Sequence, residues 1–596
     1  MFIDAKNLRE MSNALRATAL RTLRHAQSGH FGIIMSAADI VTMIYAVFMS
    51  GANDRFVLSA GHGSALLYSA LSLSGHNIGN LDSFRRFGGL PGHPEFGMDG
   101  VAATTGPLGQ GVANAVGMAI AEKHKNTCGR VFCLCSDGDL MEGVANEAIG
   151  FAGRYNLDNL VLFWDDNGLS IDGVAQTDVN IPMRMRAAGW TVVAADGNDF
   201  DSIYDAVYGA NTKGPLFVAC KTVLGADSSV AGMARAHGFG VSDLELVNLI
   251  ERFDSVSGLN LWKKLAVEFK KNRTSLRRVV LPNDVLPKCP NFISTREMSG
   301  IYLNQIVARN RNLIGGSADL SSSTNVKSDA TCEITRDDFS GNFINYGVRE
   351  HAMAAIMNGM TYAGLRTFGS TFLVFSDYMR GAMRIAALSG LPVVYVLTHD
   401  SIAVGQDGPT HQPVEQIAGL RLIPNMNVFR PSNMAEVAVA WRTALSEPCR
   451  PSCIILSRQK INQTLSAVVG TPYCGGYVVY RARRHRIRMT LIATGTEVPL
   501  AISVARRLGP WVQVVSMPSV SKFREMDAAY KKQILRGRVV VIEAGATSGW
   551  FEFADAVIGV DGFGASGPGD MVYREYGFDT SAIVQEIRGR LKNGKL

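Results

Sequence analysis

The chain has 596 residues, of which 47% are hydrophobic and 19% are charged. Because one hydrophobic core cannot organise a chain of this length, we expect a large globular protein with several domains. The formal net charge of +7 is mild for this length, so it implies neither a nucleic-acid partner nor a membrane, and it is compatible with small anionic substrates. Nine cysteines without CxxC spacing indicate reduced thiols in the cytoplasm rather than disulfides.

The first residues show no targeting pattern. Residues 1–11 lack a basic head followed by an apolar core, and the longest apolar run, residues 31–51, is interrupted by Asp39. We therefore expect neither a signal peptide nor a membrane span.

Three α/β patterns follow one another along the chain. In residues 1–268, short β-rich runs at 130–135, 159–164, 189–195 and 215–220 alternate with helical patterns, which predicts a parallel sheet covered by helices. Residues 269–292 are charged and contain Pro282, Pro287 and Pro290, which is typical of a linker.

A second pattern of strand and turn units occupies residues 293–462, and a third, shorter one occupies residues 463–596. The predicted fold class is therefore α/β, with three consecutive α/β domains that have mainly parallel central sheets.

Side chains with oxygen atoms that can bind a metal follow two of the predicted strands in the first domain. Asp137 comes after the run at 130–135, a helical pattern covers residues 140–155, and Asn167 comes after the run at 159–164. In a right-handed βαβ unit both strands are parallel, so these two side chains meet at one sheet edge beside a helix N-terminus. Their oxygens suit a magnesium ion that also binds a diphosphate. A simple capped βα loop explains the turn about equally well.

The wider sequence resembles the transketolase family, whose thiamine diphosphate motif is an Asp-Gly turn with an asparagine about 30 residues later. The resemblance covers nearly the whole chain, through SGHFG (28–32), DRFVLSAGHGSALLY (54–68), PGHPEF (91–96), TTGPLGQGVANAVGMA (104–119), GGSADL (315–320), YGVREHAM (346–353), THDSIAVGQDGPTHQP (398–413) and LSRQ (456–459). Several motifs matching in order make coincidence very improbable.

This resemblance implies a thiamine diphosphate-binding fold and a Mg²⁺ ion, for which Ca²⁺ or Mn²⁺ can substitute. The metal ligands would be Asp137, Asn167 and Leu169. The cofactor would also contact Gly106, Pro107, Leu108, Gly138, Glu142, Asp319 and an aromatic wall of Phe372, Phe375 and Tyr378. Glu350 would be the carboxyl group that hydrogen-bonds to the aminopyrimidine ring, and its burial would favour the protonated form. In the family geometry, Glu350 of one subunit and the metal ligands of the other contact the same cofactor. The resemblance therefore implies a homodimer.

The same resemblance assigns the substrate site. His30, His62, His93, His237 and His411 would line the reacting centre and transfer protons. A sugar phosphate would be bound by Arg85, Arg296, Ser323, His399, Asp407 and Arg458. A lone histidine or arginine is more often structural or solvated, so it is the grouping in matched motifs that carries these assignments.

Three positions depart from the family pattern. Phe31 stands where proline is common, and we expect it to alter only the rigidity of its loop. Ser136 stands where glycine is usual, and a left-handed backbone there would cost about 1 kcal/mol. Asp139 places a further negative charge beside the expected diphosphate. We therefore expect Ser136 and Asp139 to bear on cofactor affinity.

The run YRARRHRIR (480–488) contains five arginines. It has few interleaved aromatics and the net charge is small, so we expect a solvated face of the third domain rather than a nucleic-acid site.

The predicted function is transfer of a two-carbon ketol unit from a ketose phosphate, such as xylulose 5-phosphate, to an aldose phosphate, such as ribose 5-phosphate or erythrose 4-phosphate, in the non-oxidative pentose phosphate pathway. Two alternatives stay open. One is a related thiamine enzyme that makes 1-deoxy-D-xylulose 5-phosphate from pyruvate, and the other is a catalytically silent relative that acts as a binding partner.

Overall fold

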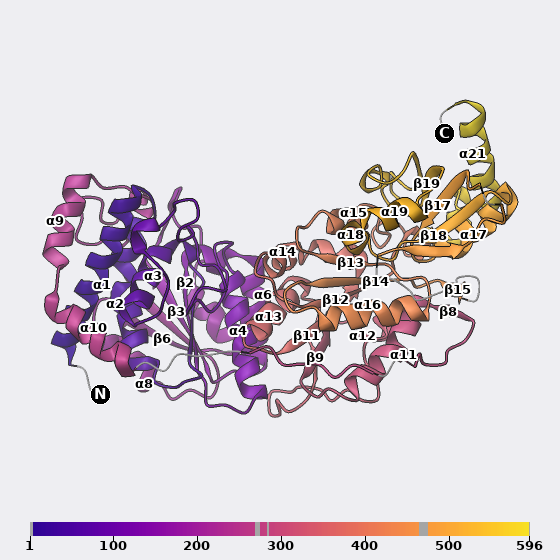
Figure 1. The fold of residues 1–596 in the computed structure, drawn as a ribbon. Coiled ribbons are helices and arrows are strands. Elements are labelled where there is room, and N and C mark those ends of the chain that lie inside the picture. Colours follow the sequence, from indigo (N-terminus) through magenta and orange to yellow (C-terminus); the bar gives the residue numbers. More distant parts are fainter. Residues whose placement is uncertain (1–3, 269–274, 283–284, 464–474, 485, 595) are drawn as a thin grey trace. The chain divides into compact units, whose positions relative to one another are not determined.

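The computed structural model describes residues 4–268, 275–282, 285–463, 475–484, 486–594 and 596. They form three large β-sheets with helices around them, coloured along the chain in Figure 1. The chain divides into two compact units, one made of residues 1–276, 335–340 and 355–364, the other of residues 277–334, 341–354 and 365–596.

The first unit is built on a five-stranded sheet with the order β1-β2-β3-β7-β6, and every neighbouring pair is parallel. Its strands are β1 (Arg55–Leu58), β2 (Val131–Ser136), β3 (Leu160–Asp166), β6 (Thr191–Asp196) and β7 (Leu216–Lys221). The four β-rich runs of the sequence are all strands of this sheet. A small hairpin, β4 (Leu169–Ser170) with β5 (Gly173–Val174), follows β3.

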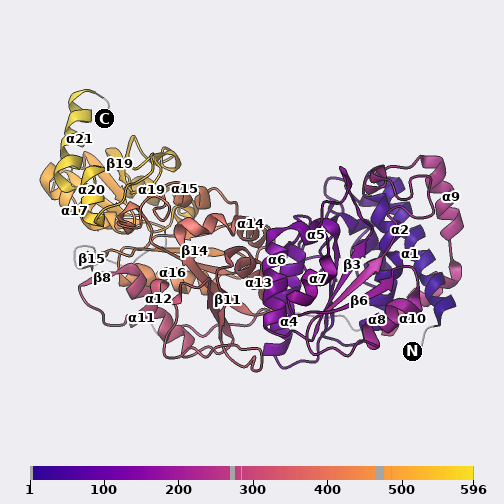
Figure 2. The ribbon, with the colours of Figure 1, turned by 180° about the vertical axis from the view of Figure 1, so that it is seen from behind.

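Helices cover both faces of this sheet. They are α1 (Ala5–Ala26), α2 (Phe31–Met43), α3 (Ser64–Leu73), α4 (Gln110–His124), α5 (Asp137–Met141), α6 (Gly143–Arg154), α7 (Ile181–Ala187), α8 (Phe200–Tyr208), α9 (Asp243–Phe253) and α10 (Val256–Glu268). Figures 1 and 2 show α1, α2 and α3 on one side of the sheet and α4 and α6 on the other.

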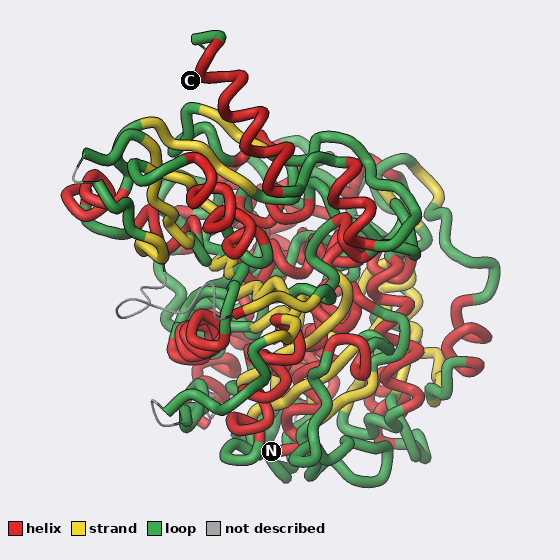
Figure 3. Tube along the Cα trace, turned by 90° about the vertical axis from the view of Figure 1, so that its right-hand side faces the viewer, coloured by secondary structure: helices red, strands yellow, loops and turns green. Residues whose placement is uncertain are grey.

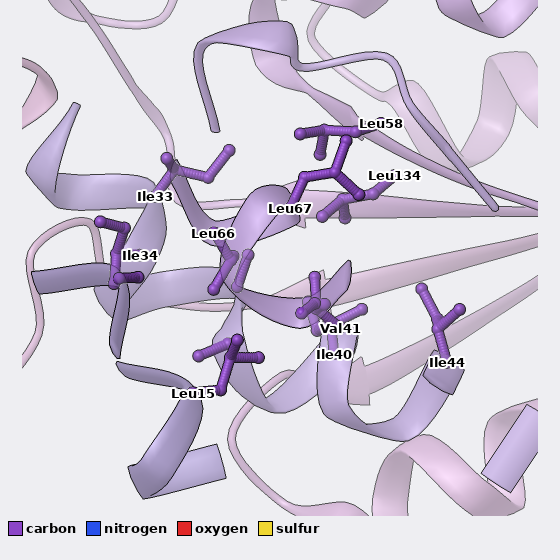
Figure 4. Packing of buried hydrophobic residues seen from close by; sticks show 14 of the residues in the cluster. Leu15, Ile33, Ile34, Ile40, Val41, Ile44, Leu58, Leu66, Leu67 and Leu134 are labelled. Carbon is purple, nitrogen blue, oxygen red and sulfur yellow. The ribbon is translucent and has the colours of Figure 1, made fainter. Parts of the chain in front are cut away.

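The apolar run of the sequence forms the centre of this layer. Helix α2 continues as one π-helical turn to Phe48, and an 18-residue window at Phe31–Phe48 is apolar enough to cross a membrane by composition. However, 89% of that window is buried inside the protein. Its side chains Ile33, Ile40 and Val41 pack with Leu15 of α1 and Leu66 of α3 (Figure 4).

The predicted single helix over 140–155 is wrong in one respect, because the chain forms two helices there. Glu142 has an extended backbone (φ −65°, ψ 135°) and separates α5 from α6. The carbonyl groups released at this break are satisfied by Asn146, whose Nδ2 donates to the oxygens of Leu140 (3.2 Å) and Glu142 (2.9 Å). Side-chain capping therefore stabilises a break that helical periodicity does not reveal.

The second unit contains a six-stranded parallel sheet with the order β10-β9-β11-β12-β14-β13. Its strands are β9 (Leu313–Ser317), β10 (Phe343–Asn345), β11 (Arg366–Phe372), β12 (Val394–Thr398), β13 (Asn427–Phe429) and β14 (Ser452–Leu456). The helices of this region are α11 (Thr295–Val307), α12 (Ser321–Thr324), α13 (Glu350–Tyr362), α14 (Arg380–Leu388), α15 (Gln416–Arg421) and α16 (Met434–Ser446). Beside them β8 (Phe292–Ser294) pairs with β15 (Lys460–Asn462) in antiparallel fashion.

The third sheet also belongs to the second unit and has the order β16-β18-β17-β19-β20. Strands β17 (Met489–Ala493), β18 (Val512–Ser516), β19 (Arg538–Ile542) and β20 (Ala556–Ile558) are parallel, and the edge strand β16 (Tyr477–Tyr480) is antiparallel. Its helices are α17 (Glu497–Leu508), α18 (Val520–Glu525), α19 (Ala528–Ile534), α20 (Gly569–Glu575) and α21 (Thr580–Lys592), the last drawn in red beside the C label of Figure 3. The prediction of an α/β fold with mainly parallel sheets is confirmed.

Candidate active site

Several of the predicted site residues of both units lie at or after the carboxyl ends of parallel strands. In the first unit His62 follows β1, Asp137 follows β2 and Asn167 follows β3. In the second unit the same position is held by Asp319, Glu350, Phe372, His399 and Arg458 after β9, β10, β11, β12 and β14. This edge is where open α/β sheets bind ligands, because side chains from several strands and the N-terminal ends of helices converge there.

Asp137 is the first residue of α5 and is only 2% exposed. Its Oδ2 atom has no hydrogen-bond partner within the described ranges. Burial, together with the nearby carboxylates of Asp165 and Asp166, raises the pKa of Asp137 to about 7. A buried acid without a counter-charge is costly, and a divalent cation removes that cost. The residues present at this edge therefore fit a magnesium ion.

Asn167 is held in one orientation by its neighbours. Its Nδ2 donates to Asp165 Oδ2 at 3.2 Å, and its Oδ1 accepts from the amide of Leu169 at 3.1 Å. Asp165 is itself buried and accepts hydrogen bonds from Ser36 Oγ (2.8 Å) and from Thr222 Oγ1. The amide oxygen of Asn167 is thus fixed on the side away from Asp165. Sequence reasoning missed this role of Asp165, although it stands two residues before Asn167.

The expected strain at Ser136 is absent. Its backbone is extended (φ −109°, ψ 175°), so the condition for strain, a left-handed conformation, is not met and a β-carbon is tolerated there. Asp139 is fully buried and its carboxylate is bound by the protein itself, because it accepts from Ser59 Oγ (2.6 Å), from the Gly109 amide (2.7 Å) and from the Ser136 amide (2.9 Å). Burial raises the pKa of Asp139, and these hydrogen bonds oppose that rise.

The segment of Gly106, Pro107 and Leu108 lies between the carboxylate edge and a group of histidines. A β-carbon on Gly138 would come within 2.8 Å of Leu108, and one on Gly106 would come within 3.2 Å of the His93 ring. Gly106 also has a φ of +133°, which glycine adopts without strain. Pro107 and Glu142 are exposed in this unit.

Four of the predicted histidines form one cluster in the first unit. The ring of His30 lies 5.2 Å from that of His62, 6.0 Å from that of His93 and 5.3 Å from that of His237, measured between centroids. Burial lowers the pKa of all four residues, and for His30, where the Arg85 guanidinium adds to the effect, the pKa falls to about 4. The cluster is therefore neutral at pH 7, and a neutral imidazole can both accept and donate a proton.

Arg85 fixes the tautomer of His30. Its NH2 nitrogen lies 3.2 Å from His30 Nδ1, and its NH1 nitrogen donates to Ser28 Oγ at 2.8 Å. Because a guanidinium group only donates, Nδ1 of His30 accepts and the ring proton is on Nε2.

Glu350 is the first residue of α13 and is 8% exposed. Burial raises the pKa of its carboxyl group, and the hydroxyl of Thr371, 3.5 Å from Oε1, is a weak opposing donor. The environment thus favours the protonated acid, as the sequence resemblance implied.

The aromatic wall forms as the spacing indicated. Residues Leu373–Asp377 are a 3₁₀-helix, in which side chains three apart lie above one another. Phe372 and Phe375 are stacked with centroids 5.8 Å apart, and Phe375 lies 6.2 Å from Tyr378. Tyr378 is 67% exposed. His411 lies here as well, 5.3 Å from Phe375, so it belongs to the second unit, whereas the cluster around His30 belongs to the first.

Arg296 and Arg458 lie near His399 in the second unit and place two positive charges beside a neutral imidazole. Burial lowers the pKa of His399 to about 3, and the positive charges of Arg296 and Arg458 contribute to that shift. Arg296 donates to the carbonyl of Ser323 and Arg458 to that of Val404, each at 2.6 Å. In the described part of the chain no carboxylate is paired with either arginine, so their charge is free to bind an anion. Asp407 is exposed on the neighbouring loop.

Comparison with known proteins identifies the family. Profiles described as the transketolase thiamine diphosphate binding domain, the transketolase pyrimidine binding domain and the transketolase-like C-terminal domain match residues 8–272, 292–463 and 475–579. A transketolase of Sinorhizobium medicae is 39% identical over 98% of this chain and 94% of its own length.

The chain belongs to the transketolase family.

Solved structures agree with this assignment. Transketolase from Leishmania mexicana matches with a TM-score of 0.91 at 33% identity, over 98% of this chain and 97% of its own. A Pichia stipitis transketolase in complex with sedoheptulose 7-phosphate matches with a TM-score of 0.85 at 31% identity, again over 98% and 97%. The chain is thus a thiamine diphosphate-dependent transferase of the transketolase type, which acts on sugar phosphates, and neither alternative function is favoured.

Proposed function

We propose that this transketolase transfers a ketol unit from xylulose 5-phosphate to ribose 5-phosphate or erythrose 4-phosphate, as a cytoplasmic homodimer. The observation that carries the assignment of residues is the unpartnered buried carboxylate of Asp137 beside the fixed amide oxygen of Asn167. The division of the chain at residues 268, 292 and 462 is part of the proposal. The eight described cysteines are all free thiols, which supports a reducing compartment.

The carboxyl edge of the first sheet would hold the cofactor. Asp137, Asn167 and the main-chain oxygen of Leu169 would bind Mg²⁺, with Ca²⁺ or Mn²⁺ as substitutes, and the ion would bind the diphosphate. When bound, thiamine diphosphate supplies the electron sink for breaking and forming the carbon–carbon bond. The main chain near these ligands is partly exposed at Gly106, Leu108 and Gly138, so a bound diphosphate could approach it there. Asp319 and Glu142 are exposed in their own units, in keeping with contacts made outside them.

Glu350 would act on the aminopyrimidine ring. Because burial favours its protonated form, the carboxyl group can donate a hydrogen bond to a ring nitrogen. Phe372, Phe375 and Tyr378 would pack against that ring, as flat aromatic faces do. The large exposed fraction of Tyr378 supports a second subunit at this site, since an aromatic side chain of this kind gains from burial.

The histidines would move protons and bind the sugar hydroxyls. With Nδ1 accepting from Arg85, His30 presents its Nε2–H group as a donor, and His62, His93 and His237 are neutral beside it. A neutral imidazole can accept a proton on one ring nitrogen and donate one from the other. The site therefore does not have to bury a positive charge before the reaction begins. His411 would serve the same reaction from the second unit.

The phosphate group of the sugar would bind at Arg296 and Arg458, with His399 and Ser323 beside them and Arg85 as a further contact. Arginine forks match a phosphate group well, and the described residues offer these two no competing carboxylate. Asp407 would accept a hydrogen bond from a sugar hydroxyl and so select its stereochemistry.

The test is ketol transfer from xylulose 5-phosphate to ribose 5-phosphate in a coupled assay. We expect Glu350→Ala to lower kcat at least a hundredfold, in line with the general contribution of acid–base groups of about 10² to 10⁴. Calorimetry should show that this variant still binds thiamine diphosphate with Mg²⁺. Thr371→Val, which removes only the weak donor to Glu350, is the matched control and should keep most of the activity.

Retained turnover in Glu350→Ala would refute the role of this residue. Pyruvate consumption with release of carbon dioxide would instead indicate the deoxyxylulose phosphate reaction. Sedimentation at several protein concentrations measures whether the chain is a dimer. The proposal requires ketol transfer to disappear at concentrations where sedimentation shows monomers.

A further inference from the structure

The C-terminal part of the chain carries its whole formal net charge. Residues 475–596 contain 18 lysines and arginines against 11 aspartates and glutamates, an excess of seven, and residues 1–474 hold 41 of each sign. A domain-level asymmetry of this kind indicates an anionic partner for that domain, which the value of +7 for the full chain conceals.

Several arginines of this basic excess lie where three parallel strands of the third sheet, β17, β18 and β19, begin. The amide of Arg484 donates to the carbonyl of Pro510 and that of Arg488 to the carbonyl of Trp511, both at 3.0 Å, so Arg484 and Arg488 lie beside the start of β18. The amide of Arg538 donates to the carbonyl of Arg488 at 2.9 Å, which adds the start of β19. This amino edge lies opposite to the carboxyl edge at which α/β sheets usually bind small ligands.

Two helix ends extend the same surface. Helix α17 ends just before Trp511, and Arg588 of α21 donates to the carbonyl of Arg507 at 3.2 Å. The term arginine face denotes the exposed residues Arg484, Arg486, Arg488, Arg506, Arg507 and Arg588.

None of these six is paired with a carboxylate within the described ranges, unlike other exposed arginines of the same domain. Arg524, Arg574 and Arg590 are paired with Glu552, Asp570 and Glu586 at 2.6, 2.9 and 2.5 Å. Six unpaired charges on one surface repel each other, and a polyanion relieves that repulsion.

The tertiary structure also supplies the aromatic side chain that the arginine run lacks. Trp511 is 39% exposed, and the Arg488 guanidinium lies 5.8 Å from its ring centroid. Arg506 lies 5.9 Å from the ring of Tyr480 on the edge strand β16. Surfaces for single-stranded nucleic acids combine a cationic track with aromatic rings on which bases stack.

A lipid surface fits this edge less well. The exposed apolar side chains Phe563 and Met571 follow the carboxyl end of β20, so they belong to the opposite edge of the sheet. Membrane binding by a peripheral surface needs apolar side chains that insert beside the basic ones. In addition, every basic residue of the loop apart from its histidine is arginine, whose planar fork binds phosphates and stacks on rings better than lysine does.

We propose that the arginine face and Trp511 bind a single-stranded polynucleotide, with its phosphates on the arginines and a base on the indole ring. Trp511 and Leu591, three residues after Arg588 on α21, are exposed apolar side chains near this face, so the choice rests on the arginine-only loop and on the stacking of Arg488 over Trp511. The site is separate from the residues assigned to ketol transfer, so its test does not depend on that assignment.

The experiment measures fluorescence anisotropy of a labelled oligouridylate of about 16 nucleotides with the full-length enzyme loaded with thiamine diphosphate and Mg²⁺. We expect micromolar affinity at low salt. The triple variant Arg484→Ser, Arg486→Ser, Arg488→Ser should bind at least tenfold more weakly and should lower the slope of log affinity against log salt by about two. Trp511→Ala should weaken binding at least about fivefold, and Trp511→Phe should restore it.

The matched control is the triple variant Arg524→Ser, Arg574→Ser, Arg590→Ser, which removes the same charge from paired arginines and should change affinity less than about twofold. Ketol transfer at the wild-type rate in both triple variants would show that they are folded. Equal losses in the two triple variants, unchanged binding in the first, or capture of the protein by phosphatidylserine vesicles under conditions where oligouridylate does not bind would each overturn the proposal.

Discussion

Two regions of this protein bury carboxylates at the ends of parallel strands. In one region an arginine neutralises the negative charge, and in the other no basic side chain of the described residues does. After β17 and β19, Glu497 and Glu543 surround Arg430, which is completely buried and also contacts Asp400 at 2.8 Å. After β2, Asp137 has no cation beside it among the described residues, and one of its oxygens has no partner. In the first arrangement each of these carboxylates has an arginine beside it, so its charges are complete. The second has no counter-charge among the described residues and is incomplete.

The pKa values reflect this difference. Burial alone would raise the pKa of Glu543, but Arg421 and Arg430 hold it at about 2. Burial and the neighbouring carboxylates leave the pKa of Asp137 at about 7. The comparison teaches that burial of an acid does not mark a functional site by itself. A buried acid that lacks both a counter-charge and a hydrogen-bond partner for one oxygen is the stronger candidate.

The largest expected effect comes from breaking the complete arrangement. Arg430→Met leaves Asp400 and Glu497 buried without a counter-charge, and we expect the free energy of unfolding to fall by roughly 3 to 5 kcal/mol. Urea unfolding of the cofactor-free protein, followed by tryptophan fluorescence, measures this change. Arg450→Met removes an exposed arginine paired with Glu525 and should cost less than about 1 kcal/mol. Equal costs in the two variants would show that burial does not distinguish these pairs.

The next effect concerns the incomplete arrangement. Asp137→Ala should weaken Mg²⁺-dependent binding of thiamine diphosphate at least about a hundredfold, because the change removes a carboxylate ligand. The unfolding free energy of the cofactor-free protein should fall by much less than in Arg430→Met, since Asp137 has no counter-charge to lose among the described residues. Calorimetry with and without Mg²⁺ measures the first quantity and urea unfolding the second. Unchanged cofactor affinity would remove Asp137 from the site.

The smallest effect is a change in pH dependence. The folded-state pKa of Glu543 lies below its ordinary value of 4.5, so the stability it contributes is present above pH 4.5 and is lost as the pH falls toward 2. We expect the unfolding free energy of Glu543→Gln to fall less steeply over this range than that of the unchanged protein. Glu586→Gln, on the exposed helix α21, should leave the slope as it was, and a steeper fall in Glu543→Gln would contradict the comparison.

Local sequence patterns predicted much of this molecule for a simple physical reason. Strands buried on both faces are short apolar runs, so β2, β3 and β7 were visible as such, and the parallel order of β2 and β3 brought Asp137 and Asn167 to one edge. The spacing of Phe372, Phe375 and Tyr378 likewise predicted a shared helical face. The residue roles came from the resemblance in the motifs, since composition and spacing alone left a capped loop as an equal alternative.

Other features depend on contacts between residues far apart in the chain. The hydrogen bonds from Ser36 and Thr222 to Asp165 are decided by such contacts. The same holds for Trp511, which lies beside Arg488 because β17 and β18 are neighbours. The extended backbone of Ser136 and the break at Glu142 are stabilised by near neighbours, Asp139 and Asn146, but apolar periodicity does not reveal them.

The sequence by itself determined the α/β layers and the family, because both are carried by short-range apolar spacing and by motif identity. Only the tertiary structure decided which buried charges have partners and which do not. That distinction depends on distances of a few ångströms between segments that the fold brings together, and electrostatic energies inside a protein change steeply over such distances.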